Sequence, residues 1–214
     1  MLQTAALILA AGKGTRMHSD KPKVLQTVLG EPMLRYVLEA VRPVFDGRVL
    51  VVVGHQAGMV EAAFPDAAFV RQEQQLGTGH ALMQAMPALE GQCERVLVVN
   101  GDTPLLSEDV VRHFVEASAG ADLAFATIEL DDPAAYGRVV RAAGGGVRAI
   151  VEAKDYDPAL YGPEPHEVNA GMYCVRLDLA ARLLPRIGNA NKSGEYYITD
   201  LISLAVAEGC KVQG

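Results

Sequence analysis

The segment from Leu9 to Lys23, LAAGKGTRMHSDKPK, carries the residues of this chain that could most readily do chemistry. It follows a short apolar run and contains two glycines, one arginine and three lysines. Glycine amides such as that of Gly12 can approach an anion closely because no Cβ intervenes. Arg16 and Lys23 would add hydrogen-bond donors and positive charge for phosphate oxygens. The segment therefore predicts an anion site, and a triphosphate would use all of these groups at once.

Two common nucleotide motifs do not fit this segment. The dinucleotide fingerprint G-x-G-x-x-G requires a third glycine where Met17 stands. The Walker pattern requires a Gly-Lys-Ser/Thr ending, which is absent here. For the loop taken alone, a plain turn between a strand and a helix remains the alternative.

A second candidate follows another apolar run, RVLVVN, which ends in Asn100, Gly101 and Asp102. A carboxylate at such a strand end requires a cation or hydrogen-bond donors. Mg²⁺ prefers one or two carboxylates together with phosphate oxygens and water, so we predict that Asp102 is a metal ligand. An ordinary turn aspartate is the alternative, because Thr103 and Pro104 follow.

The apolar runs of the first half predict the strands that must position these residues. Runs such as VLVVVG and VLVVN show no polar alternation, which is typical of parallel strands covered on both faces by helices. Ligands of such sheets bind beyond the carboxyl ends of the strands, where this chain places LAAGKGTRM, VVVGH and VVNGD. The predicted strands span 4–10, 48–54, 67–70 and 95–100, and the predicted helices span 33–41, 57–63, 78–86 and 108–117.

From residue 121 onward the pattern predicts a mixed extension of the sheet. The predicted strands span 122–130, 138–141, 147–153 and 168–177, and the predicted helices span 178–186 and 199–208. We expect this extension to wrap the second half of the ligand. Because no linker separates the halves, the sequence predicts one α/β unit with two lobes, 1–120 and 121–214.

Composition argues against several other classes of protein. A net charge of −7 over 214 residues argues against a nucleic-acid partner. The three cysteines are widely spaced and form no C-x-x-C pair, so reduced thiols in the cytoplasm are expected. The apolar run 5–11 is too short to cross a bilayer, so no membrane partner is expected.

Several motifs, taken together, resemble one family. They are LAAGKGTRM with PKVL, QLGTGHA, GD, YGR, VEAKD, NAG and GEYYITD, and they occur in the family's order over nearly the whole chain. The chain resembles the nucleotidyltransferases that act on sugar 1-phosphates, and most of all their uridylyltransferase branch. The resemblance implies a Rossmann-like, doubly wound, mostly parallel sheet with a mixed-strand sugar-binding lobe. It also implies UMP transfer from UTP to N-acetylglucosamine 1-phosphate with Mg²⁺.

The resemblance further implies roles for individual residues. Backbone groups would cradle the nucleotide at Leu9, Ala10, Ala11 and Gly12, with Asn100 and Gly101 beside them. Gln72, Gly77 and Thr78 would read the uracil, since a glutamine amide can both donate and accept. The residues expected around the sugar are Gly137, Glu152, Asn169, Tyr197 and Thr199.

The implied mechanism needs no general base, because the attacking oxygen of a sugar 1-phosphate is already anionic. Catalysis would consist of positioning and of charge neutralisation by Mg²⁺, Arg16 and Lys23. We predict that Asp102 holds the metal.

Several alternatives remain open at these positions. Thr78 could serve as a helix N-cap, and Glu152 could pair with Lys154 at the surface. Asn100 stands where relatives often carry an aromatic residue, and Ala170 stands where threonine is usual. The chain could also use another sugar 1-phosphate, such as glucose 1-phosphate, or bind sugar nucleotides without turnover.

Full-length relatives continue into a left-handed β-helix that binds acetyl-CoA and forms trimers. No hexapeptide repeat of that kind occurs in these 214 residues. We therefore expect this chain to lack acetyl transfer, to be monomeric, and to bind magnesium weakly, since relatives carry a second metal ligand further along.

Overall fold

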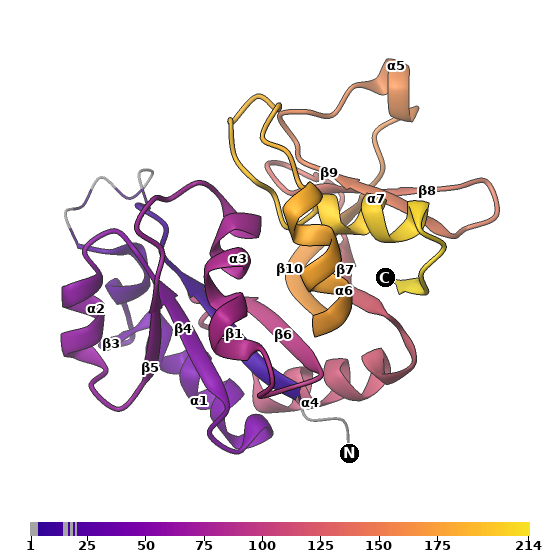
Figure 1. Ribbon diagram of the computed structural model, residues 1–214. Helices are drawn as coiled ribbons and strands as arrows, with labels where there is room; N and C mark the ends of the chain where they lie inside the picture. Colours follow the sequence, from indigo (N-terminus) through magenta and orange to yellow (C-terminus); the bar gives the residue numbers. More distant parts are fainter. Residues whose placement is uncertain (1–3, 15–16, 18, 20) are drawn as a thin grey trace.

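A computed structural model describes residues 4–14, 17, 19 and 21–214, and its centre is one sheet (Figure 1). The strands are β1 (Thr4–Ala10), β4 (Val49–Val53), β5 (Ala68–Arg71), β6 (Arg95–Asn100), β7 (Leu123–Glu129), β8 (Arg138–Arg141), β9 (Val147–Val151), β10 (Glu167–Arg176) and β11 (Val212–Gln213). Their order is β11-β7-β10-β6-β1-β4-β5, and β8 joins β10 and β9 beside this path.

The strands of the first half run parallel to one another. β1 lies between β4 and β6 and pairs in parallel with both, and β4 pairs in parallel with β5. β10 then pairs antiparallel with both β6 and β7, so the direction of β7 returns to that of β6. The structure confirms the predicted α/β class with a mostly parallel sheet. One sheet continues without a break from the strands of residues 4–100 to those of residues 123–213.

Helices cover both faces of this sheet because its strands are apolar on both sides. The α-helices are α1 (Met33–Phe45), α2 (Ala57–Ala63), α3 (Thr78–Leu89), α4 (Glu108–Ala117), α5 (Pro158–Tyr161), α6 (Leu177–Leu183) and α7 (Asp200–Ala207). Short 3-10 helices are η2 (Lys23–Leu25), η3 (Ser118–Gly120) and η4 (Leu184–Arg186). In α1 the buried residues Leu34, Val37, Leu38 and Val41 recur at helical spacing and form one apolar face.

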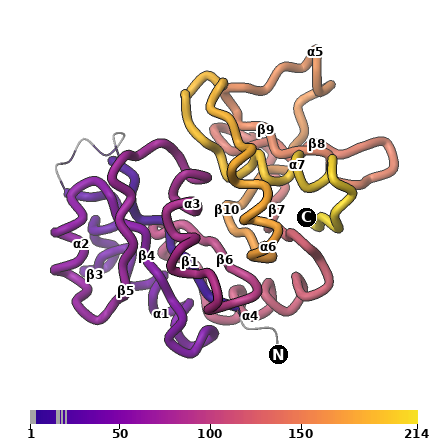
Figure 2. Tube along the Cα trace, in the orientation of Figure 1, coloured from indigo at the N-terminus to yellow at the C-terminus, as the bar shows by residue number. Residues whose placement is uncertain are grey.

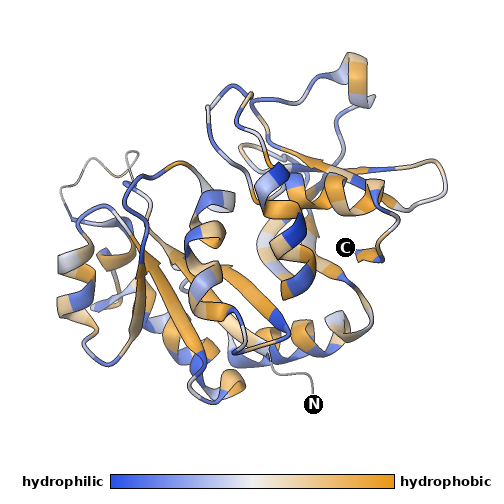
Figure 3. Ribbon diagram, in the orientation of Figure 1, coloured by the Kyte–Doolittle hydropathy of each residue, from blue (hydrophilic) through white to orange (hydrophobic). Residues whose placement is uncertain are grey.

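Alternating residues of β1 divide the core into two clusters. Leu7 packs with the buried residues of α3, α6 and α7. Ile8, the next residue, packs with those of α1 and with Val111 of α4. Figure 3 shows the strands between these layers in orange, the colour of apolar residues. Side chains of successive strand residues point to opposite faces, so one apolar strand serves both clusters.

Most predicted elements are present, but several ends differ. The helix predicted over 33–41 continues to Phe45, where Asp46 ends it with a left-handed φ of 49°. The helix predicted over 78–86 continues to Leu89. Ser107 caps α4 by accepting a hydrogen bond from the Val110 amide at 3.3 Å.

The predicted N-cap role of Thr78 is wrong. Gly77 occupies the cap position of α3, and no side chain caps the helix there. Thr78 is the first helical residue, and its Oγ1 instead accepts a hydrogen bond from the Ile198 amide at 3.0 Å. A contact between residues so distant in sequence overrides the local cap preference.

The segment before α7 joins the second half of the chain to the first. Figure 2 shows the two halves on opposite sides of the molecule, indigo to magenta and orange to yellow. The Tyr196 amide donates to Leu76 O at 2.8 Å, and the Gly79 amide donates to Tyr196 O at 2.8 Å. Within the described residues, no helix has the length and apolar character that a membrane crossing requires.

Candidate active site

A cleft of about 570 Å³ opens at the carboxyl ends of β1 and β6. Leu9, Ala10, Ala11 and Gly12 line it at the end of β1, and Asn100 and Asp102 line it after β6. Other lining residues are Lys13, Gly14, Lys23, Val24, Gln72, Gln75, Gly77, Thr78, Ala81 and Glu195. Gly101, between Asn100 and Asp102 in the chain, donates its backbone amide to Leu9 O at 2.9 Å. The structure thus gathers the predicted nucleotide residues that it describes, whereas Arg16 lies outside the described residues.

The loop after β1 folds back against Lys23 and requires a glycine to do so. Gly14 has a φ of 60°, in the left-handed region, and a Cβ added there would lie 2.7 Å from Lys23 Cβ. Glycine avoids both the strain and the clash. The close approach keeps Lys23 beside the exposed backbone of Gly12 and Lys13.

Lys23 and Asp102 form an ion pair inside this cleft. Their side chains are only 36% and 27% exposed, so the pair is partly shielded from water. The sequence placed both residues in one site but did not predict that they would bind each other. The expected requirement of Asp102 for a cation is therefore met by this lysine.

Gln72 is held tightly at the edge of the cleft. The residue is 3% exposed, and its backbone amide donates to Val53 O at 2.7 Å. The side-chain Nε2 donates to Gly77 O at 3.1 Å and lies 2.9 Å from His80 Nδ1. The side-chain nitrogen of Gln72 is thus engaged by the protein, and its contact with a base stays a prediction.

The predicted sugar residues Gly137, Glu152 and Thr199 lie together. The Thr199 hydroxyl, from a residue only 2% exposed, donates to Glu152 Oε1 at 3.0 Å. A Cβ on Gly137 would lie 3.5 Å from either carboxylate oxygen of Glu152. Among the described residues Glu152 has no ion pair with Lys154, whose Nζ donates to Ser193 Oγ at 3.5 Å. The surface-pair alternative for Glu152 is therefore wrong.

Burial raises the pKa of the Glu152 carboxyl above its ordinary value. The Thr199 hydroxyl opposes this shift by stabilising the charged form, and the nearby carboxylates of Asp155 and Glu195 add to it. The hydroxyl of Tyr197 donates to one of these neighbouring carboxylates, that of Asp155, with 3.3 Å to Oδ2. This end of the site is acidic.

Asn169 is placed differently from the other sugar residues. Its Nδ2 donates to the Tyr173 hydroxyl at 2.6 Å, and its Oδ1 accepts from the Gly171 amide at 2.9 Å. Its own backbone amide donates to Gly137 O at 2.8 Å. The side chain thus stabilises an irregularity in β10, between Asn169 and Tyr173, where the pairing with β7 changes register.

Sequence reasoning missed two carboxylates of this region, Asp155 and Asp200. Both line a cavity of about 300 Å³ with Glu152, Tyr197 and Thr199. Burial, with the charges of Glu152 and Asp155, raises the pKa of Asp200 to about 6. Both residues stand in the motifs VEAKD and GEYYITD, which was the available signal. No cluster of three or more metal-binding His, Cys, Asp or Glu side chains occurs in the described part of the chain.

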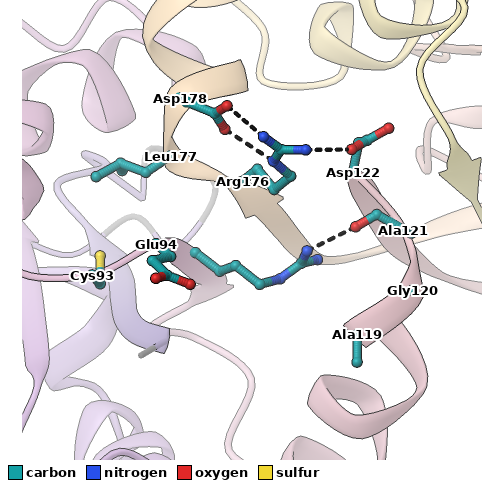
Figure 4. Close-up of a pocket in the computed structure, with 10 residues that line it drawn as sticks. Cys93, Glu94, Ala119, Gly120, Ala121, Asp122, Arg176, Leu177 and Asp178 are labelled. Carbon is teal, nitrogen blue, oxygen red and sulfur yellow. Dashed lines mark hydrogen bonds and ion pairs between the residues drawn. The ribbon is translucent and has the colours of Figure 1, made fainter. Parts of the chain in front are cut away.

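A larger cavity, of about 670 Å³, lies at the opposite end of β6 (Figure 4). Its guanidinium groups already have partners within the protein. Arg95 donates to Ala121 O at 2.7 Å, and Arg176 pairs with Asp178 at 2.6 Å and with Asp122 at 3.0 Å. Ligands of parallel sheets bind at the carboxyl ends of the strands. The smaller cleft is therefore the candidate site.

The chain matches one protein family over most of its length. Residues 6–161 match the family described as the MobA-like NTP transferase domain. The chain belongs to this family. This NTP transferase chain is also 65% identical, over 99% of its length, to "Bifunctional protein GlmU" of Nitratidesulfovibrio vulgaris (strain Hildenborough). A protein of the same name from Oleidesulfovibrio alaskensis is 55% identical over 98% of the chain.

The chain spans about half the length of these relatives, 47% and 46% respectively. Among solved structures, a putative glucose-1-phosphate thymidylyltransferase from Bacillus anthracis matches with a TM-score of 0.78 at 18% identity. The match covers 99% of this chain and 86% of the other. A UDP-glucose pyrophosphorylase complexed with UDP-glucose matches with a TM-score of 0.71 at 19% identity, covering 97% and 88%. At such low identity these two structures show a shared fold alone.

Proposed function

We propose that this NTP transferase chain transfers UMP from UTP to N-acetylglucosamine 1-phosphate, giving UDP-N-acetylglucosamine and pyrophosphate. The observation that carries the proposal is the cleft that joins the glycine backbone after β1 to the Lys23–Asp102 pair. The GlmU relatives support the same assignment, since they are 55–65% identical over almost the whole chain.

The phosphates of UTP would lie along the segment from Ala11 to Gly14. Backbone amides of this turn can bind phosphate oxygens without interference from a Cβ at Gly12 or Gly14. Lys23, held at the cleft by η2, would exchange Asp102 for a phosphate oxygen. Arg16 would add a second cation from the same loop.

The base would lie between Gln72 and the beginning of α3. Among the described residues, no acceptor binds the Gly77 backbone amide, so it can donate to a base carbonyl. Gln72 lines the same part of the cleft and can accept from a base N–H. Uracil presents this pair of an acceptor and a donor side by side.

Asp102 fits a magnesium ion that is shared with the nucleotide. It is the one carboxylate at the end of β6, beside the predicted phosphate segment. Mg²⁺ takes one or two carboxylates and completes its shell with phosphate oxygens and water, so a larger protein cluster is not required. When bound, the ion would supply positive charge that neutralises the phosphates.

The reaction would then be an in-line displacement at the α-phosphorus. An oxygen of the sugar phosphate forms the new P–O bond, the bond to the β-phosphate breaks, and pyrophosphate leaves with the electron pair. Lys23 and the glycine amides hold the two anions together and offset their repulsion. No proton has to move, because the attacking oxygen is already ionised.

Glu152 and Thr199 would bind the sugar hydroxyls across the cleft. Glu152 Oε1 accepts a hydrogen bond from the Thr199 hydroxyl. The carboxylate has further lone pairs that can accept hydrogen bonds from ligand hydroxyls. Gly137 has no side chain, so a sugar ring can approach this carboxylate closely.

Pyrophosphate release tests the proposal. The chain would be incubated with UTP and a panel of sugar 1-phosphates, with and without Mg²⁺. We expect release with N-acetylglucosamine 1-phosphate to exceed that with glucose 1-phosphate, and to require the metal. Faster release with another sugar would reassign the acceptor. Binding of UDP-N-acetylglucosamine without any release would identify a binding module instead.

A further inference from the structure

His80 of α3 contacts the buried glutamine at the base end of the cleft. Its Nδ1 lies 2.9 Å from Gln72 Nε2, and its ring lies beside that of Tyr196, with 6.3 Å between the ring centroids. None of the roles assigned above uses this histidine. Its place in the motif QLGTGHA, two residues after Thr78, puts it within the first turn of α3.

Gly77 determines which way the Gln72 amide faces. Gly77 O is an acceptor only, and it already receives the Ala81 amide at 3.1 Å. The Gln72 atom that lies 3.1 Å from Gly77 O must therefore be the NH₂ nitrogen, since an oxygen there would face a second oxygen. The nitrogen has two protons, and one of them is used by this contact.

The second amide proton can go only to an acceptor, so His80 Nδ1 must be unprotonated. A neutral imidazole with a bare Nδ1 carries its proton on Nε2. That Nε2 lies 3.4 Å from the exposed side-chain amide of Gln84, which can turn to offer its oxygen. Both ends of the imidazole ring are then satisfied.

We propose that His80 is a positioning residue that sets base selectivity by locking the Gln72 amide. Both protons of Gln72 Nε2 are then directed at protein acceptors, one at Gly77 O and one at His80 Nδ1. Gln72 therefore presents only its side-chain carbonyl oxygen to a bound base. Among the described residues, no donor reaches this oxygen. The site thus recognises a base with an N–H at that position and disfavours one with a bare ring nitrogen.

Uracil has such an N–H at N3, whereas cytosine has an unprotonated N3 at the equivalent position. A cytosine bound in the same pose would set its N3 lone pair against the Gln72 oxygen. If the amide could turn over, its NH₂ would satisfy cytosine as well. The lock by His80 therefore discriminates UTP from CTP, which deepens the proposed function and rests on it.

Substitutions at position 80 test the lock because two isosteres place an acceptor differently. In His80→Asn the amide oxygen can occupy the place of Nδ1, whereas in His80→Gln the acceptor lies further out, near the place of Nε2. We expect His80→Ala and His80→Gln to lower the UTP/CTP ratio of kcat/KM about 10-fold. Most of this loss should come through KM for UTP, and His80→Asn should restore the ratio to within about 2-fold of the wild type.

Two measurements keep this test separate from the proposed reaction. Nitrogen-15 NMR of the unsubstituted chain should show His80 with a bare Nδ1 and a protonated Nε2. Calorimetric binding of UTP and CTP should show the same dependence on residue 80 without any turnover. If binding of UTP and CTP depends on residue 80 as expected but no uridylyl transfer occurs, the proposed reaction is contradicted and the role of His80 in base selectivity is retained. A protonated Nδ1, or an unchanged UTP/CTP ratio in His80→Ala, would overturn the lock.

Discussion

The two ends of the candidate site differ in charge and in the kind of group that lines them. At the end of β1, backbone amides and Lys23 lie around the carboxylate of Asp102, which is paired with Lys23. At the other end, Glu152, Asp155 and Asp200 line a cavity, where the Thr199 hydroxyl donates to Glu152 and the Tyr197 hydroxyl donates to Asp155. One end is suited to phosphates and the other to an uncharged polyol.

This difference orients a ligand that is itself charged at one end. A sugar phosphate placed the wrong way round would bring its phosphate to three carboxylates, and like charges repel most strongly where water is scarce. Burial raises the pKa of Glu152 and Asp200, which means that their charged forms are disfavoured in this cavity. Hydroxyl groups of a neutral sugar can stabilise the charged forms by donating hydrogen bonds to them.

The largest effect is expected at the phosphate end. Lys23→Ala and Asp102→Ala should each lower kcat by about two to three decades, since each removes a group that offsets transition-state charge, about 3–4 kcal/mol. Lys21→Ala is the matched control, because the side chain of this exposed lysine of the same loop forms no hydrogen bond or ion pair with a described residue. Near-normal kcat in either variant, by pyrophosphate release, would remove that residue from catalysis.

The sugar end should respond in KM for the sugar. Glu152→Gln replaces a charged acceptor by a neutral amide, which should raise KM for the sugar 1-phosphate about 10- to 100-fold. KM for UTP should stay near that of the wild type, because the phosphate end is untouched. Lys154→Ala is the control, as Lys154 contacts Ser193 and not Glu152. Equal increases in both KM values would mean that the two ends are not separate.

Asp200 should make stability depend on pH. Its pKa is about 6 in the folded chain, against 3.8 for the ordinary group, so the unfolded chain loses this proton first as pH rises. Stability should therefore fall between pH 4 and 6 and stay lowered above that window. Asp200→Asn should raise Tm at pH 8 by about 2–4 °C, on the order of 1 kcal/mol after allowance for solvent screening.

Scanning calorimetry at pH 4 and pH 8 measures this effect. The gain in Tm for Asp200→Asn should be present at pH 8 and small at pH 4. Asp131→Asn serves as the comparison, since Asp131 is exposed and lies outside the cavity. A gain of the same size at both pH values would show that ionisation of Asp200 is not its cause.

The smallest effect concerns a turn outside both ends of the site. Leu29 is 96% exposed and has a φ of 51° in the tight turn between the short strands β2 (Thr27–Val28) and β3 (Glu31–Pro32). Asparagine tolerates this conformation better than leucine, so Leu29→Asn should stabilise the chain by about 0.5–1 kcal/mol. Urea unfolding measures this, and kcat should not change. Val28→Asn, outside the left-handed region, should bring no such gain.

The elements near the site were predictable because their signals are local. The predicted strands 4–10, 95–100 and 138–141 and the helices 57–63 and 108–117 have the same bounds in the structure. Apolar runs and helical spacing act within a few residues, so they can be read without knowledge of the partner. The hairpin of β2 and β3 and the short helix α5 were missed, since two-residue strands and one-turn helices carry almost no periodicity.

The pairing of side chains could not be predicted in the same way. Lys23 and Asp102 are 79 residues apart, and Glu152 and Thr199 are 47 apart. Thr78 illustrates the same limit. Its local preference predicted a helix cap, but its hydroxyl oxygen accepts a hydrogen bond from the distant amide of Ile198 instead. Which donor meets which acceptor depends on the order of the strands.

The sequence by itself determined the apolar strands, the helices between them and the order of motifs that indicated a nucleotidyltransferase. Tertiary structure alone decided that Lys23 neutralises Asp102 and that the nitrogen of Gln72 turns toward Gly77 and His80. Periodic burial is a property of consecutive residues and survives many arrangements of the chain. A hydrogen bond is made or lost within a few tenths of an ångström, and only the packed sheet fixes distances between remote residues that closely.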